Sequence, residues 1–300
     1  MTWAAAALAI ALAVAPLALA GEGGSEAADF VRLPPPRPGD WRAAFDEPVQ
    51  TFASYKKTAG RAPGFETRRI RLLPLGEARE GDDELIGPLA EFLGAYFMTR
   101  TVIEPRQPMP ERVRRRPSRG FGTQYLADDI LDAIAPFGLA DGTARLAIAS
   151  EDLYGSSPGG GYLNFVFGMG AAGRRVGLFS AARYGLRYGN EPPGITREKR
   201  IFKVAAHELG HVFGLAHCQT YSCGMNGSNS LAESDSRPIH LCPECLEKLE
   251  WHLGFDRVLR YRVLAGIYAR LGWKDEEAFV ARRAEIESSR AAGPARGQER

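Results

Sequence analysis

The side chains of this protein that bind metals best are concentrated in one short window. Of the five histidines in 300 residues, three lie between positions 207 and 217, and all four cysteines lie between positions 218 and 245. The window begins with the pattern H-E-x-x-H-x-x-G-x-x-H. Imidazoles and thiols gathered in this way are typical of metal sites, and a metal site constrains the fold because its ligands must meet. We therefore expect the chain to fold around residues 207–245.

The first part of the window predicts a catalytic zinc site. His207 and His211 are four residues apart, so on an α-helix both lie on one face and can bind the same Zn²⁺. Gly214 permits the left-handed turn that ends the helix, so that His217 can return as the third ligand. Glu208 can face a zinc-bound water, whose pKa the metal lowers to roughly 7, and act as general base. Three protein ligands and an open fourth position are typical of a catalytic zinc.

The second part of the window predicts a structural metal site. The cysteines form two pairs with chelating spacings, C-x4-C (Cys218 and Cys223) and C-x2-C (Cys242 and Cys245). Four thiolates would complete the coordination of a structural zinc, so His240 beside the second pair is a less favoured ligand. The alternative is two disulfides, because the apolar N-terminus predicts export and even cysteine counts are common in bridged proteins. We expect zinc, and the alternative stays open at this point.

The whole window resembles one peptidase family. HELGHVFGLAH is similar to the extended zinc motif of the metzincin metallopeptidases, and Met225 resembles the methionine of their Met-turn. The cysteine order that follows resembles the archaemetzincins, as do QYLADDIL, ASEDLYGSS and NFVFGMG upstream, so the resemblance covers residues 67–255. It implies a zinc metallopeptidase with two Zn²⁺, one catalytic and one structural, and it suggests aminopeptidase-like activity.

The elements expected before the motif alternate between strands and helices, which predicts an α/β (α+β) fold with a mixed twisted sheet and an active-site helix. The resemblance makes this a metzincin-like zincin fold with a small zinc-stapled C-terminal part, and it implies that the strand at 162–168 is the sheet edge that pairs with an extended substrate. A solvated loop is expected at 112–119. We expect strands at 68–75, 101–103, 145–149, 162–168 and 176–180, and helices at 83–98, 124–134 and about 197–215.

Four segments flank the predicted catalytic domain, 67–255. Residues 1–20 are apolar and end in Ala-Leu-Ala, which predicts a signal peptide; the alternative is an uncleaved membrane anchor. The Pro-rich residues 21–66 are expected to be a linker that packs partly on the domain, rather than a pro-segment. Residues 256–288 predict a helical hairpin and residues 289–300 a disordered tail. The protein is thus expected to be exported, periplasmic or secreted.

The composition is that of an ordinary soluble globular protein, with 45% hydrophobic residues, 25% charged residues and a formal net charge of +2. It gives no indication of nucleic-acid binding, and no stable membrane partner is expected. The expected partner is a peptide or protein substrate. A second hypothesis is a non-catalytic, zinc-stabilised protein that holds peptides in the cleft. Glu208 argues against it, because a pure binding protein needs no base at that position.

Overall fold

The computed structural model describes residues 29–135, 142–157 and 159–292. The predicted signal peptide (1–20), the first part of the N-terminal extension (21–28) and residues 293–300 of the predicted tail lie outside these described residues. None of the helices in the described ranges has both the length and the apolar character needed to cross a bilayer.

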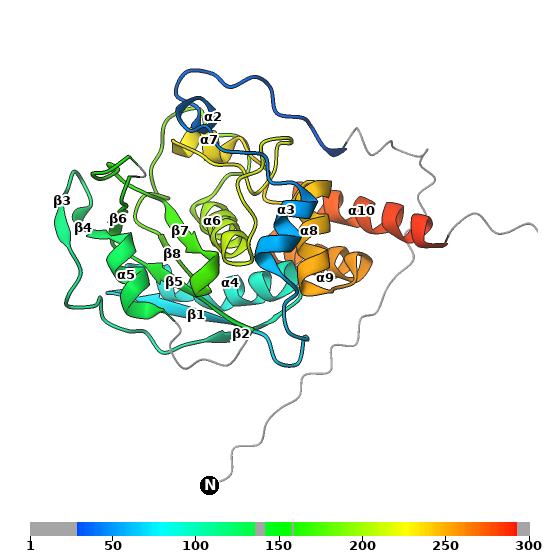
Figure 1. Cartoon of the computed structure of the whole chain (residues 1–300), viewed down its shortest axis with the longest axis horizontal. Helices are drawn as coiled ribbons and strands as arrows, with labels where there is room; N and C mark the ends of the chain where they lie inside the picture. The colour runs from blue at the N-terminus through cyan, green and yellow to red at the C-terminus, as the bar shows by residue number, and fades with distance from the viewer. Residues whose placement is uncertain (1–28, 136–141, 158, 293–300) are drawn as a thin grey trace, which may run out of the picture.

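A mixed five-stranded sheet forms the centre of the catalytic domain (Figure 1). Its strands are β1 (Arg69–Leu75), β2 (Arg100–Ile103), β5 (Thr143–Ala149), β7 (Gly168–Ala171) and β8 (Val176–Ser180). They are ordered β2-β1-β5-β8-β7, and the first four are parallel. Strand β7 pairs antiparallel with β8 and forms one edge of the sheet. The predicted mixed sheet is therefore confirmed.

Helices cover both faces of this sheet. They are α4 (Asp82–Tyr96), α5 (Ala127–Ile134) and α6 (Arg197–Val212). In β1, Ile70 and Leu72 belong to the hydrophobic cluster that contains the apolar faces of α4 and α6. Leu73 and Leu75 belong to a second cluster with α5. Because both faces of the central strands are buried, their sequences are almost continuously apolar, as parallel strands between helices usually are.

A second sheet corrects two of our predictions. Its three strands are β3 (Arg115–Ser118), β4 (Gly122–Leu126) and β6 (Asp152–Tyr154), in the order β3-β4-β6. The predicted loop at 112–119 therefore contains β3, which forms a hairpin with β4. The helix predicted from 124 begins only at Ala127 as α5. Gln124 and Leu126 are buried and flank half-buried Tyr125, so burial alternates along this segment as it does in a strand. The segment was predicted as helix because a run this short fits either element.

The predicted edge strand also needs correction. Residues 162–167 form no ladder, and the edge strand is β7, which begins where the predicted strand ends. The backbone groups of this irregular segment instead form separate hydrogen bonds with different partners. The carbonyl of Asn164 accepts from Arg116 Nη2 (2.9 Å) and Gln124 Nε2 (2.8 Å), and Val166 N donates to Leu153 O (3.0 Å). Strand-forming residues are present, but the segment makes only isolated hydrogen bonds with its neighbours, including Leu153 of β6, so no ladder forms.

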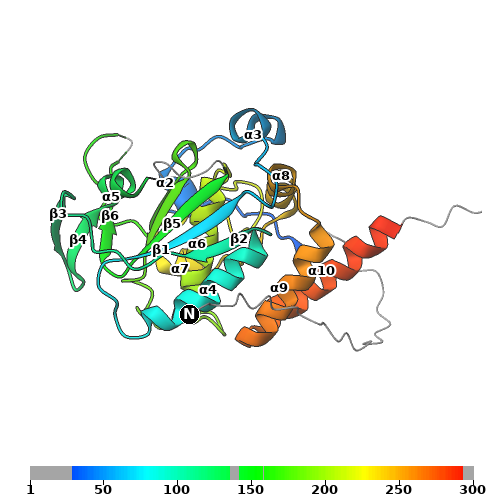
Figure 2. The ribbon, with the colours of Figure 1, turned by 90° about the horizontal axis from the view of Figure 1, so that it is seen from below.

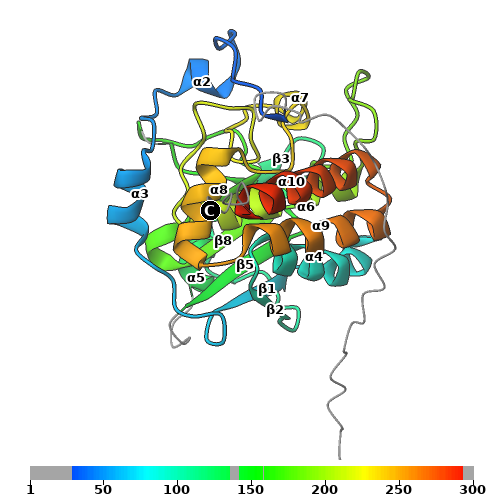
Figure 3. The same ribbon diagram turned by 90° about the vertical axis from the view of Figure 1, so that its right-hand side faces the viewer.

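The C-terminal part is helical, as predicted. It contains α7 (Leu231–Asp235), α8 (Pro243–Leu253), α9 (Arg257–Leu271) and α10 (Lys274–Ala292). Helices α9 and α10 form a hairpin, and α9 packs against α4 (Figures 2 and 3). The disordered tail was predicted to start at 289, but α10 continues to Ala292. Ala291 and Ala292 have the highest helix propensity of any residue type, which explains the longer helix.

The N-terminal extension crosses the surface above the loops that follow α6 (Figure 1). Its described part, residues 29–66, includes the short helices α2 (Trp41–Ala44) and α3 (Phe52–Ala59). Two backbone hydrogen bonds attach its first residues to the segment after His217: Leu33 N donates to Thr220 O (3.0 Å), and Ser222 N donates to Val31 O (2.8 Å). The extension is therefore packed on the region that the motif forms.

Candidate metal centre and active site

Helix α6 positions the first half of the motif. Its N-terminus is capped by the side chain of Thr196, which accepts a hydrogen bond from Lys199 N at 3.1 Å. The helix ends at Val212, three residues before the predicted end. Gly214 has φ +87°, the left-handed conformation that glycine adopts without strain, and the chain turns back there. This turn brings His217 to the face of α6.

The three motif histidines meet at one point. His211 Nε2 lies 3.0 Å from His207 Nε2 and 3.2 Å from His217 Nε2. All three side chains are half-buried, and one ligand atom from each lies within 4.8 Å of the others. The structure thus brings together the three residues that the sequence proposed as ligands of one ion.

The other ring nitrogens determine what these Nε2 atoms can do. His207 Nδ1 lies 2.8 Å from Gly224 O, and His211 Nδ1 lies 2.7 Å from Leu215 O. A carbonyl oxygen only accepts, so each Nδ1 carries the hydrogen and each Nε2 of a neutral ring presents a lone pair. Burial lowers the pKa of His207 to about 3 and also lowers that of His211, which keeps both rings neutral. Lone pairs converging at such distances repel one another unless a cation lies between them. The donor set therefore fits a divalent metal such as zinc.

Glu208 lies on the same helix and is almost fully buried, with 4% of its surface exposed. Burial raises the pKa of its carboxyl to about 8. Its Oε1 lies so near the edge strand that a Cβ added to Gly168 would be 2.5 Å from it. A Cβ added to Gly170 would lie 2.6 Å from the carbonyl oxygen of Glu208. These two glycines let β7 approach α6 closely, and the sequence did not reveal that role.

Met225 lies under the histidines, as predicted from the resemblance to a Met-turn. It is 1% exposed, and a Cβ added to Gly210 of α6 would lie 2.4 Å from its Sδ. The polarizable thioether thus packs directly on the backbone of the helix between the two ligand positions. Gly210 is a further residue that the sequence alone did not identify.

The histidines and Glu208 open into a cleft with a volume of ≈ 850 Å³. Its walls come from the N-terminal extension, from residues 163–170 including β7, from α6 and from the loop that precedes α8. Lys203 also lines the cleft; its half-buried side chain donates from Nζ to Ser234 O (2.7 Å) and Arg237 O (2.6 Å), and desolvation lowers its pKa to about 8. The cleft is large enough for several residues of a peptide.

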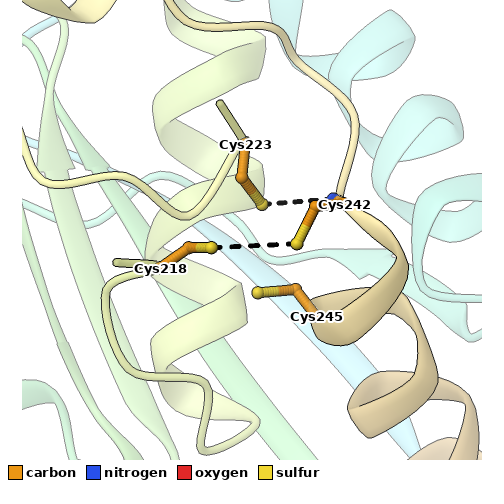
Figure 4. Close-up of side chains that lie close together, drawn as sticks. All are labelled: Cys218, Cys223, Cys242 and Cys245. Atoms are coloured by element: carbon orange, nitrogen blue, oxygen red, sulfur yellow. Dashed lines mark hydrogen bonds between the residues drawn. The ribbon is translucent and has the colours of Figure 1, made fainter. Parts of the chain in front are cut away.

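The four cysteines form a second cluster (Figure 4). Cys218 and Cys223 come from the loop after His217, and Cys242 and Cys245 from the start of α8. All four are buried and free, and their Sγ atoms lie within 4.8 Å of one another. This arrangement fits a closed tetrathiolate site.

Hydrogen bonds to sulfur also fit that site. Cys223 Sγ accepts from the backbone nitrogens of Cys242 (3.2 Å) and Met225 (3.5 Å), which favours its thiolate form. The neighbouring cysteines hold the pKa of Cys218 below its usual range, whereas burial, Cys218 and Cys242 raise the pKa of Cys223. Four buried thiols this close together cannot all ionise, because four negative charges would repel one another, unless a cation such as zinc binds between them.

His240 is separate from both clusters. Its ring stacks on Phe279 of α10 with centroids 3.6 Å apart, and it is not among the residues that could share a metal with the cysteines. This placement agrees with the expectation that His240 is a less favoured ligand than the four cysteines.

One functional residue comes from outside the motif. Glu47, in the N-terminal extension, places both carboxylate oxygens 2.9 Å from His217 Nδ1. Burial opposes its ionisation, but hydrogen bonds from His217, Trp41 and Gln219 outweigh this and lower its pKa. No spacing in the sequence pointed to Glu47, which is 170 positions from its partner.

The chain is similar to known proteins of one family. Residues 125–251 match the family model described as "Peptidase family M54". Archaemetzincin-2 of Macaca fascicularis is 33% identical over 278 residues, which cover 80% of this chain and 73% of the relative. Archaemetzincin-2 of Mus musculus is 40% identical over 271 residues, covering 79% and 73%. The crystal structure of archaemetzincin from Methanopyrus kandleri matches with a TM-score of 0.50 and 30% identity, over 64% of this chain and 99% of that chain. This chain therefore belongs to the archaemetzincin family, and it is a zinc metallopeptidase.

Proposed function

We propose that the protein hydrolyses peptide bonds at a zinc held by His207, His211 and His217, with Glu208 as general base. The proposal rests on one arrangement: three Nε2 atoms converge in a cleft that fits a peptide, and the buried carboxylate of Glu208 lines the same cleft. When bound, the zinc supplies Lewis-acid chemistry, because it polarises the scissile carbonyl and lowers the pKa of water.

Glu208 moves the proton in this proposal. Its carboxylate takes a proton from the attacking water and passes it to the nitrogen of the leaving amine. Burial favours the neutral acid, but a cation bound to the neighbouring histidines would favour the carboxylate. The two opposing effects keep the group able both to accept and to release a proton near neutral pH.

Strand β7 orients the substrate. It is an edge of the five-stranded sheet, it pairs on one side with β8, and Gly168, Met169 and Gly170 line the cleft. An extended peptide can add to such an edge as a further strand, so that backbone hydrogen bonds hold the scissile bond beside Glu208. We propose this role for β7, in place of the segment at 162–168.

A second zinc completes the proposal. Cys218, Cys223, Cys242 and Cys245 would bind it as four thiolates, without an open position for substrate. Its role would be to fix the loop that carries Met225 and Gly224, whose carbonyl holds His207. We also propose that the protein is exported, because of the composition of residues 1–20. A mature N-terminus at Gly21 on the exported protein would support this, and an intact Met1 in the cytoplasm would contradict it.

Cleavage of a peptide library, with products identified by mass spectrometry, tests the activity. We expect the wild type to release N-terminal residues, as the family resemblance suggests for an aminopeptidase-like enzyme. Internal cuts would instead establish an endopeptidase. Glu208→Ala should retain its zinc and produce neither. A fully loaded Glu208→Ala protein that still cleaves would refute the mechanism, and a loaded wild type that cleaves nothing would favour a peptide-binding protein.

A further inference from the structure

The carboxylate of Glu47 is fixed behind the third histidine. Its Oε2 accepts hydrogen bonds from Trp41 Nε1 and Gln219 Nε2, both at 3.1 Å, in addition to its contacts with His217. These donors come from two segments, the extension itself and the chain just after His217. Both donors bind Oε2, and together they hold the carboxylate against His217 Nδ1.

The same extension holds the turn that presents His217. Gln50 Nε2 donates to Gly214 O at 2.8 Å, and Gln50 Oε1 accepts from Ala216 N at 3.2 Å. Helix α3 packs so tightly here that a Cβ added to Gly214 would lie 2.9 Å from the Cβ of Ala59. One glutamine thus satisfies a donor and an acceptor in the short segment between the second and third ligands.

Trp41 of the N-terminal extension contacts both His217 and the segment that contains Gly227 and Glu233. Its ring centroid lies 4.9 Å from that of His217, and it lines the cleft together with Phe45. Its backbone nitrogen donates to Glu233 Oε1 at 3.0 Å, and Gly227 leaves room for its ring, since a Cβ there would be 2.4 Å away. The extension therefore contacts the third ligand, the cleft, Gly227 and helix α7.

The three histidines differ in how they are oriented. His207 and His211 stand on a capped helix, and backbone carbonyls accept from their Nδ1 atoms. His217 stands on a loop after a left-handed turn, where the helix cannot fix its ring. A ligand of this kind needs an acceptor from elsewhere, and a carboxylate both orients the ring and increases the basicity of Nε2.

We propose that the N-terminal extension is a working part of the metal centre, with Glu47 as the positioning residue for His217. The proposal rests on the proposed function, because it takes His217 to be a zinc ligand. It gives a role to the segment for which the Pro-rich sequence predicts a linker that packs partly on the domain. Glu47 lies outside residues 125–251, which match the family model, so the motif alone does not identify it.

Zinc affinity at the histidine cluster tests this role without using activity. Full-length protein, with its cysteine site filled, would be titrated against a chromogenic chelator of known zinc affinity. We expect Glu47→Ala to raise the zinc Kd of the histidine cluster by about 10- to 100-fold. Glu47→Gln should raise it less, because the amide oxygen still accepts from Nδ1 but carries no charge. The control is Asp46→Ala, which removes an adjacent exposed carboxylate and should leave the Kd unchanged.

The outcomes separate this proposal from the proposed function. Equal Kd values for the wild type and Glu47→Ala would overturn the positioning role. A rise in KM with unchanged zinc Kd would also overturn it, because Glu47 would then contact the substrate. A wild type that binds zinc at the histidines but cleaves no peptide would overturn the peptidase mechanism, while the order of Kd values would still decide the role of Glu47.

Discussion

The histidine cluster and the cysteine cluster lie in one stretch of 39 residues but have opposite environments. The histidines are half-buried and line a cleft of ≈ 850 Å³, whereas all four cysteines are buried, two of them completely. The histidine rings use their second nitrogens to fix their orientation and leave one side accessible. The cysteine sulfurs are surrounded by backbone and by one another. The difference indicates chemistry at the first cluster and stabilisation at the second.

The two clusters are nevertheless connected through one loop. Cys218 follows His217 directly, and its backbone nitrogen donates to Met225 O at 2.7 Å. Gly224 follows Cys223, and its carbonyl accepts from His207. We call the histidine cluster the open site and the cysteine cluster the closed site. Removal of the metal from the open site should leave the closed site intact. Removal of the metal from the closed site should also disturb the open site, because the shared loop carries Gly224.

The largest expected effect is the loss of all activity when the open site loses its metal. Brief treatment with a chelator at neutral pH should reduce the zinc content from two ions per chain to one and abolish cleavage. One equivalent of zinc should restore it. The buried thiolates should retain their ion, because their ligands are not accessible to the chelator. Metal analysis and peptide cleavage on the same samples measure this. Simultaneous loss of both ions would contradict the claim that the histidine site is accessible and the cysteine site is not.

Cys242→Ser should mainly reduce the stability of the protein, in contrast to metal removal from the histidine cluster, which mainly reduces its activity. We expect a loss of about 4 kcal/mol or more in the free energy of unfolding, because binding of a structural zinc is coupled to folding. Zinc content should fall in parallel, and zinc affinity at the histidines should weaken through the shared loop. Denaturant unfolding and metal analysis measure both quantities. If neither quantity changes, the four-cysteine zinc site is wrong, and a mass lower by four hydrogens in the wild type would establish two disulfides instead.

Gly168→Ala should have a smaller effect, directed at the open site. The new Cβ would lie 2.5 Å from Glu208 Oε1, so either β7 or the carboxylate must move. We expect kcat to fall about 10- to 100-fold and stability to fall by about 1–3 kcal/mol. Gly173→Ala is the control, since a Cβ there meets nothing within 4 Å. Equal activity of the two variants would show that the contact between β7 and Glu208 is unimportant.

Asp82→Asn should have the smallest effect and should spare both sites. Burial of Asp82 opposes ionisation, but hydrogen bonds from Ser150, Arg79 N and Arg197 outweigh it and lower its pKa from the usual 3.8. Its stabilising contribution is therefore complete above pH 3.8 and is lost as the pH falls through the lower folded value. At pH 7 the variant should lose about 1–2 kcal/mol, and the difference from the wild type should shrink in acid. Urea unfolding at a series of pH values measures this, and a constant difference would contradict it.

Local spacing explains which parts of the site the sequence could predict. His207 and His211 share a helix face, Gly214 turns the chain, and the cysteines occur in chelating pairs, so each relation lies within a few residues. Glu47, Gly168 and Gly210 were missed because their roles depend on packing between elements distant in sequence. A carboxylate in a Pro-rich extension, or a glycine in a strand, gives no local indication of its partner.

The fold shows the same limit. Strand β8 has the predicted bounds because it is apolar, short and buried on both faces. The predicted strand at 162–168 had equally suitable residues but makes only isolated hydrogen bonds with β6, whereas β3 forms in an arginine-rich segment because β4 pairs with it. Pairing in a sheet is decided by neighbours, and the sequence of one strand does not contain them.

Anomalous diffraction at the zinc absorption edge tests the contrast between the two clusters most directly. Crystals of the full-length protein should give two anomalous peaks, one among the Nε2 atoms of His207, His211 and His217 and one among the four Sγ atoms. Difference maps should show an open coordination position at the first peak only. A single peak at the cysteines in crystals grown with excess zinc, or a histidine peak with no open position, would contradict the assignment of catalysis to the first cluster and stabilisation to the second.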